Sequence, residues 1–294
     1  MQVSTKIFNK QSVEAFKDLT GQIQRKQEQV ASGKELIRPS DDPVKAARVM
    51  VVKEQQAQAK QHLRNIDLSY VKLSLTDSAL EQLQNLLTRT YELSVQAASD
   101  TNATGRKAIS IEVKAILENL RDIANSTDAS GRQIFGGFKV GEKPFQTSVS
   151  GTTSYSGDRG TQEIMISSSM RLQTSLDGST VFERVPTETD GYKSIFELVG
   201  SLHTSLASGI GSDLPINELK SAVSHIGDQR ALVGAQMNKA DNQRALLESR
   251  DLLLTENIGE MEDADLSKIV TDLQNLLVNK EIAQKTFARI SQLN

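Results

Sequence analysis

His62, His203 and His225 are the first residues to test for chemistry, because an imidazole can act as a general base or as a metal ligand. They lie far apart in the sequence, and none has a second histidine at the spacing of a helical zinc motif. The chain also has no cysteine, which excludes disulfides, thiol catalysis and cysteine-held metals. We therefore expect no metal and no cofactor, and we interpret the histidines as solvated or capping side chains.

Acidic residues are the other candidates for acid–base or metal chemistry. Asp41 and Asp42 have no base near them in the sequence, whereas Asp42 before Pro43 is typical of a helix start with aspartate as the N-cap. The acidic stretch 260–265 lacks the spaced ligands and central glycine of a calcium loop, and it suits the positive end of a following helix. We predict that the protein is not an enzyme.

The composition argues against nucleic-acid and membrane partners. The formal net charge is −3, which provides no basic surface for DNA, RNA or anionic lipid. No apolar run reaches the length of a membrane span, and the first residues lack the apolar segment of a cleaved signal peptide. Tryptophan is absent and only 4% of residues are aromatic, which favours long, narrow helix contacts over one large core.

Two long segments repeat apolar residues every seven positions, the pattern of supercoiled helices. In the first, residues 44–98, the column is Ile66, Leu73, Leu80 and Leu87, and a second helix follows a break at 101–105. The second segment begins after Pro215, and an acidic break is expected soon after its last column residue. Its column is Leu219, Ile226, Val233, Ala240, Leu247 and Leu254. Weaker repeats predict one helix at each end of the chain.

Between these segments, residues 131 to 186 are rich in Gly, Ser and Thr, and short apolar–polar alternations replace the helical repeat. The alternations at 161–167 and 170–174 predict strands, and Asp177-Gly178 predicts a hairpin turn. We expect a small β-rich domain here.

The order of these segments predicts a mainly α protein with a small β-rich insert, built as an elongated antiparallel coiled-coil or helical-bundle rod. The expected parts are the N-terminal helix of an inner coiled coil with its linker, the outgoing half of a helical shaft, a β-rich outer domain, the returning half of the shaft, and the C-terminal helix of the inner coiled coil. Their predicted boundaries are 1–42, 43–138, 139–190, 191–258 and 259–294.

We predict that the two ends pair with each other and with neighbouring copies. Residues 1–40 have seven Lys and Arg against four Asp and Glu, and residues 255–294 have the reverse. Opposite charges favour pairing, but so narrow an apolar stripe is marginal in water, so neighbouring subunits are expected to complete its burial. The predicted assembly residues are Phe16, Ile23, Val30, Leu266, Leu273, Leu276, Phe287 and Ile290.

Three motifs resemble the flagellin superfamily. Residues 31–43, Ala-Ser-Gly-Lys-Glu-Leu-Ile-Arg-Pro-Ser-Asp-Asp-Pro, are similar to a stretch near the N-terminus of that superfamily. Residues 123–137 resemble the segment that closes its second helix, and residues 261–265 resemble the motif before its last helix. Within the superfamily, the prolines of the first motif and Tyr-Ser-Gly-Asp at 155–158 resemble the proteins at the junction of hook and filament.

The resemblance implies a flagellin-like fold and a structural subunit of the bacterial flagellum, secreted through the flagellar type III apparatus after a transient stay in the cytoplasm. It implies a homo-oligomeric ring between the first hook-associated protein and the flagellin filament, and a cytosolic export chaperone at the C-terminal helices. Two alternatives stay open: a minor filament flagellin, and a secreted coiled-coil adhesin or effector whose β domain binds a ligand.

Overall fold

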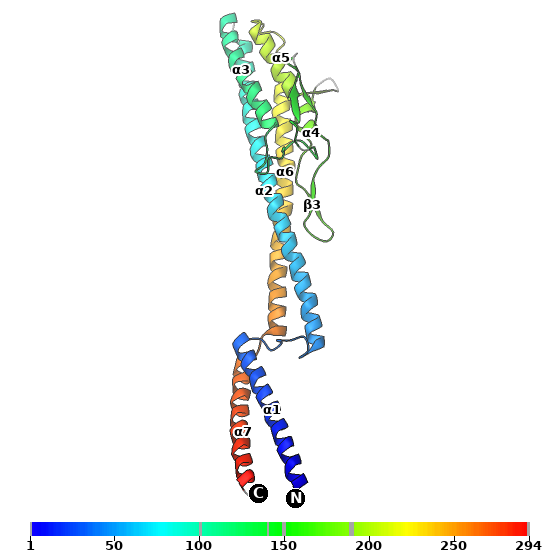
Figure 1. Cartoon of the computed structure of the whole chain (residues 1–294). Coiled ribbons are helices and arrows are strands. Elements are labelled where there is room, and N and C mark those ends of the chain that lie inside the picture. Colours follow the sequence, from blue (N-terminus) through cyan, green and yellow to red (C-terminus); the bar gives the residue numbers. More distant parts are fainter. Residues whose placement is uncertain (1, 100–101, 140, 149–150, 188–190, 293–294) are drawn as a thin grey trace. The chain divides into compact units, whose positions relative to one another are not determined.

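The computed structural model describes residues 2–99, 102–139, 141–148, 151–187 and 191–292 (Figure 1). The helices of this part are α1 (Gln2–Ser32), α2 (Pro43–Ser99), α3 (Ala103–Ala124), α4 (Gly178–Glu183), α5 (Ile195–Ala207), α6 (Ile216–Glu262) and α7 (Leu266–Gln292). The chain divides into two compact units, one of Met1–Lys60 with Ser249–Asn294 and one of Gln61–Glu248. The five-part division expected from the sequence stays a prediction.

Side-chain caps fix where the helices begin. Asp42 Oδ1 accepts hydrogen bonds from the backbone N–H groups of Val44 and Lys45 at 3.1 and 2.9 Å, so the predicted cap of α2 is confirmed. At the start of α3, the Asn102 side chain accepts from Thr104 N at 3.0 Å. The break expected between these two helices is therefore a new helix start rather than a kink.

The end of α6 differs from expectation. The sequence predicts an acidic break soon after Leu254, but α6 continues to Glu262. Glutamate is a good helix former, and the residues from 255 to 262 include neither proline nor an aspartate. The helix therefore ends two turns later, immediately before Asp263.

The second unit buries the predicted seven-residue columns. Ile66, Leu80 and Leu87 of α2 are fully buried, and Leu73 is 3% exposed. The five α6 column residues of this unit are also buried: Leu219, Ile226, Val233, Ala240 and Leu247. The sequence pattern therefore gave the buried face of both long helices correctly.

Hydroxyl groups occupy other buried positions of α2. Ser69, Thr76 and Thr90 are each at most 2% exposed. Their side chains donate to the carbonyls of residues 65, 72 and 86, four positions earlier in the same helix, at 2.7 to 2.9 Å. Because a buried hydroxyl without a partner is costly, this internal bonding lets small polar side chains fill a narrow seam.

Within the described residues, the strands form three separate two-stranded antiparallel sheets. They pair β1 (Phe145–Thr147) with β2 (Thr153–Tyr155), β3 (Glu163–Met165) with β4 (Arg171–Gln173), and β5 (Val185–Pro186) with β6 (Tyr192–Lys193). The predicted fold class, mainly α with a small β-rich insert, is confirmed. The insert is not one sheet, and its last pair extends past the predicted boundary at residue 190.

The hairpin turn predicted at Asp177-Gly178 is wrong. Asp177 caps α4 instead, since its carboxylate accepts from Ser179 N at 2.9 Å and from Thr180 N at 3.3 Å. An Asp-Gly pair suits a hairpin, but an aspartate two or three residues before free N–H groups also starts a helix. The helical alternative buries Val181 and Phe182 completely.

Aromatic rings supply the core beneath the insert. The Phe182 ring meets those of Phe135, Phe145 and Phe196 at centroid distances of 5.1, 4.8 and 5.6 Å. Tyr155 packs against Phe145 at 5.0 Å, and its hydroxyl lies within donating distance of the carbonyl oxygens of Phe135, before the strands, and Asp158, after β2, at 3.0 and 2.7 Å. The few aromatic residues of this chain are therefore concentrated where the sheets are too small to enclose a core.

The Tyr155 hydroxyl makes the free energy of unfolding fall at alkaline pH, where this group ionises. Burial first, and then the carboxylates of Asp177 and Asp158, raise the pKa of Tyr155 from its ordinary value of 10.0 to about 12. Because the folded pKa is the higher one, the stabilisation is fully present below pH 10.0 and is lost as the pH rises through about 12. Urea unfolding of wild type and Tyr155→Phe should show a stability difference that is constant below pH 10.0 and shrinks above it.

Tyr192→Phe provides the matched control, because Tyr192 is 69% exposed. Its stability difference from wild type should be small and should not shrink in this pH range. A pH-independent difference for Tyr155→Phe would contradict the assignment.

Candidate assembly interface

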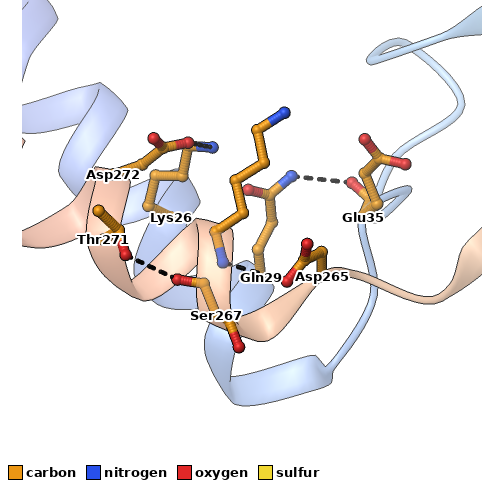
Figure 2. A network of polar contacts seen from close by, with 8 residues as sticks. Lys26, Gln29, Glu35, Asp265, Ser267, Thr271 and Asp272 are labelled. Carbon is orange, nitrogen blue, oxygen red and sulfur yellow. Dashed lines mark hydrogen bonds and ion pairs between the residues drawn. The ribbon is translucent and has the colours of Figure 1, made fainter.

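The helices at the two ends of the chain, α1 and α7, pack side by side and antiparallel within the first unit (Figure 1). The Phe16 and Phe287 rings meet edge to face, with centroids 5.9 Å apart. Towards the other end of the pair, Lys26 forms an ion pair with Asp272 (Figure 2), and the Nζ–Oδ2 distance is 3.0 Å. From the first contact to the second, the residue number rises along α1 and falls along α7. The two helices therefore run antiparallel, as the sequence predicts.

The predicted assembly residues fall into three groups by their exposure in the single chain. Ile23 is buried at 5% exposure, and Leu266 is 48% exposed. The Ile290 side chain lies outside the described part of the structure. The remaining five are half-buried: Phe16, Val30, Leu273, Leu276 and Phe287. Their part in contacts between subunits stays a prediction.

Ile269 belongs to the pair but was not among the predicted assembly residues. It is 5% exposed, as buried as Ile23, and lies one turn after the exposed Leu266. The signal for it was present, since Ile269, Leu276 and Ala283 recur every seven residues. A seven-residue repeat drifts slowly around a straight helix, so the column that starts at Leu266 is not the best-buried column at this end.

The pair leaves apolar surface uncovered. An open groove of about 660 Å³ runs between the helices, and its lining includes Ala15, Leu19 and Ala283. The outer side of α7 exposes a further stripe, in which each residue is between 40% and 57% exposed: Leu266, Val270, Leu277, Val278 and Ile282. Exposed apolar surface of this kind is typical of interaction sites, because it costs free energy in water.

The start of α7 is held by the acidic stretch that precedes it. Asp265 Oδ1 accepts from Lys268 N at 3.1 Å, so the predicted helix-start role is confirmed for this residue. The opposite charges of the two ends meet at Lys26–Asp272 and at Lys34–Glu262, 2.9 Å apart. Charge therefore contributes to pairing at specific points, and the apolar contacts carry most of it.

No constellation for chemistry gathers in the described residues. Among them, no group of three or more His, Asp or Glu side chains could hold a metal ion. The histidines are partly buried rather than solvated. His203 Nδ1 lies 3.0 Å from the Ser110 carbonyl of α3, and His225 Nε2 lies 3.0 Å from the Thr180 carbonyl of α4. Both rings therefore join neighbouring elements within the second unit.

Comparisons with known proteins give the class of protein to which this helical arrangement corresponds. Residues 3–139 match the family described as the bacterial flagellin N-terminal helical region. This match confirms the resemblance to the flagellin superfamily that the sequence motifs indicate.

More particularly, the chain is similar along its length to proteins named flagellar hook-associated protein 3. The one from Salmonella typhimurium is 23% identical over 98% of this chain and 96% of its own length. The one from Escherichia coli is 24% identical over 92% of this chain and 91% of its own length. The crystal structure of hook-associated protein 3 from Legionella pneumophila matches 72% of this chain and 98% of that chain, with a TM-score of 0.66 at 15% identity, which establishes a shared fold.

Throughout the described ranges, no helix combines the length and the apolarity that crossing a bilayer requires.

Replacing a buried and an exposed side chain of α1 with alanine should have different effects on the stability of the helix pair. Ile23→Ala removes a buried side chain from the helix pair and should cost about 2 kcal/mol, the low end for such changes because one side of the pair is open. Val13→Ala, at a residue 54% exposed, should cost less than about 0.5 kcal/mol. Cleavage of α1 by a protease at low concentration should therefore be about 30-fold faster in Ile23→Ala and nearly unchanged in Val13→Ala. Equal cleavage rates in the two variants would show that the pair is not packed as described.

Proposed function

We propose that the protein is a non-enzymatic structural subunit that joins the hook of the bacterial flagellum, through the first hook-associated protein, to the flagellin filament. The observation that carries the proposal is the apolar surface of the α1–α7 pair that the chain itself leaves uncovered. A subunit of a ring needs such a surface, because neighbours must cover what one copy cannot. The similarity over nearly the whole chain to hook-associated protein 3 supports the same role.

The proposed mechanism is mechanical. The terminal helices, 1–42 with 259–294, form an inner coiled coil whose burial neighbouring copies complete. Residues 43–138 and 191–258 form the shaft, and the β-rich part, 139–190, forms the outer domain. The predicted assembly residues Phe16, Ile23, Val30, Leu273, Leu276 and Phe287 hold the pair together, while Leu266 and the exposed α7 stripe face other subunits.

The proposed partners are further copies in a ring, the first hook-associated protein and flagellin. A cytosolic export chaperone is proposed to cover the C-terminal helices before secretion through the type III apparatus. The exposed stripe of α7 supports this part of the proposal, since an uncovered apolar helix face in the cytoplasm risks aggregation.

Removal of residues 1–30 should abolish assembly and leave the second unit folded. The deletion takes away α1 and the partner of α7, but no residue of Gln61–Glu248. We expect the truncated protein to retain a cooperative unfolding transition by circular dichroism, and to fail to restore motility to a strain that lacks the gene. Full-length protein expressed in the same strain is the control, and filament growth with the truncated protein would contradict the proposal.

The position of labelled protein on intact flagella separates the alternatives. A single spot at the hook end is the expected result. Label along the entire filament would favour a minor filament flagellin, and full motility of a deletion strain would favour a secreted adhesin or effector.

A further inference from the structure

The β3–β4 hairpin has one buried and one exposed face. Side chains alternate along its strands, so Ile166 and Leu172 are fully buried, whereas Met165 is 46% exposed. Figure 1 shows the hairpin extending away from the rest of the insert. The hairpin and the stretches of α2 and α6 that it contacts all belong to the second unit, Gln61–Glu248. The hairpin is therefore packed against its own unit on one side only.

The outer edges of the hairpin carry backbone carbonyls that its own strand pairing does not use. Ile166 N donates across the hairpin to the Met170 carbonyl at 3.0 Å, and Met165 lies opposite Arg171. Because paired residues of antiparallel strands alternate between bonding each other and pointing away, the carbonyls of Met165 and Arg171 point outward. One of them lies on each edge of the hairpin.

Each of these two carbonyls is bound by a different long helix. Asn65 Nδ2 of α2 donates to the Met165 carbonyl at 2.8 Å. Lys239 Nζ of α6 donates to the Arg171 carbonyl at 2.9 Å. The two acceptors sit on strands that are paired with each other, so a chain of hydrogen bonds leads from α2 through β3 and β4 to α6.

The face of α2 beneath the hairpin is built from residues that let it approach closely. Asn65, Ser69, Lys72 and Thr76 follow at spacings of four, three and four, which places them on one side of the helix. Ser69 is fully buried and Thr76 is 2% exposed. Lys72 Nζ donates to Gln162 Oε1 at 3.0 Å, just before β3. Small buried side chains therefore alternate along this face with longer ones that bind the hairpin.

The neighbouring β1–β2 pair is attached in another way. Arg121 of α3 donates to the Gly151 carbonyl at 3.2 Å, and Asn125 Nδ2, at the end of the same helix, donates to the Phe145 carbonyl at 3.1 Å. Phe145 also belongs to the aromatic cluster. The printed contacts of β1–β2 thus lead to one long helix and to the core of the insert, whereas β3–β4 connects two long helices.

We propose that the β3–β4 hairpin is a strap that holds α2 and α6 together within the second unit, with Asn65 and Lys239 as its two anchors. One apolar column per helix is a narrow contact, and a cross-connection to both helices resists their local separation. The strap acts only while both anchors are made, because a hairpin bound to one helix no longer connects it to the other. This property of the single chain is independent of the proposed flagellar role.

This dependence on both anchors gives the test. Native-state hydrogen exchange of the full chain, followed by mass spectrometry, should show about fivefold lower protection in residues 61–76 of α2 and 233–247 of α6 for Asn65→Ala, and the same for Lys239→Met. The double variant should also lose about fivefold, because either change alone opens the strap. Two independent hydrogen bonds would instead give a loss of about 25-fold in the double variant.

Asn85→Ala and Lys220→Met are the matched controls, since both replace exposed residues of the same two helices with the same change of side chain. They should leave the protection of both stretches unchanged, and Lys239→Arg, which keeps a donor, should lose less than Lys239→Met. Unchanged protection of α3 and α5 shows that each variant is folded. Loss confined to the hairpin, equal effects of anchor and control variants, or a multiplied loss in the double variant would each overturn the strap.

Discussion

The seven-residue apolar repeat of α2 and α6 is the constraint on which the rest of the structure depends. One column of large apolar residues per helix is too narrow to enclose a thick core, and the second buried column of α2 includes small polar residues such as Ser69, Thr76 and Thr90. Burial is therefore spread along the helices. Small side chains fill the spaces between columns, and the buried serines and threonines satisfy their hydroxyls within their own helix. Most of the aromatic residues, which are scarce in the sequence, lie in the region where the small sheets need a thick core.

Those parts of the fold that follow from local pattern could be predicted, and those that depend on competition between patterns could not. The columns from Ile66 to Leu87 and the cap at Asp42 require only spacing and residue type. The prediction for the end of α6 was wrong because glutamates continue a helix as readily as they precede one. The prediction for Asp177 was wrong because Asp-Gly suits both a hairpin and a helix start. Only packing decides between such alternatives.

The packing of α1 against α7 was predictable to the level of a helix face but not of individual contacts. Periodicity identified the stripes of α1 and α7, yet it could not tell that Ile269 is buried and Leu266 is open one turn before it. Contacts between distant segments were invisible for the same reason. Both motifs that resemble the flagellin superfamily at the two ends of the chain could be read from the sequence, but nothing in either one shows that Lys34 meets Glu262.

The hydroxyl bonding inside α2 has a further consequence for the alignment of the two long helices in the second unit. Because the buried hydroxyls bond within their own helix, they impose no hydrogen bond that depends on the partner, and an axial slip of α6 by seven residues would restore apolar column against apolar column. What such a slip would break is charge pairing: Arg230 lies 3.0 Å from Asp77, and Arg244 lies 3.0 Å from Asp67 and over the Tyr70 ring. The pairing of Arg230 and Arg244, whose side chains are 30% and 27% exposed, therefore favours the observed alignment of the two helices.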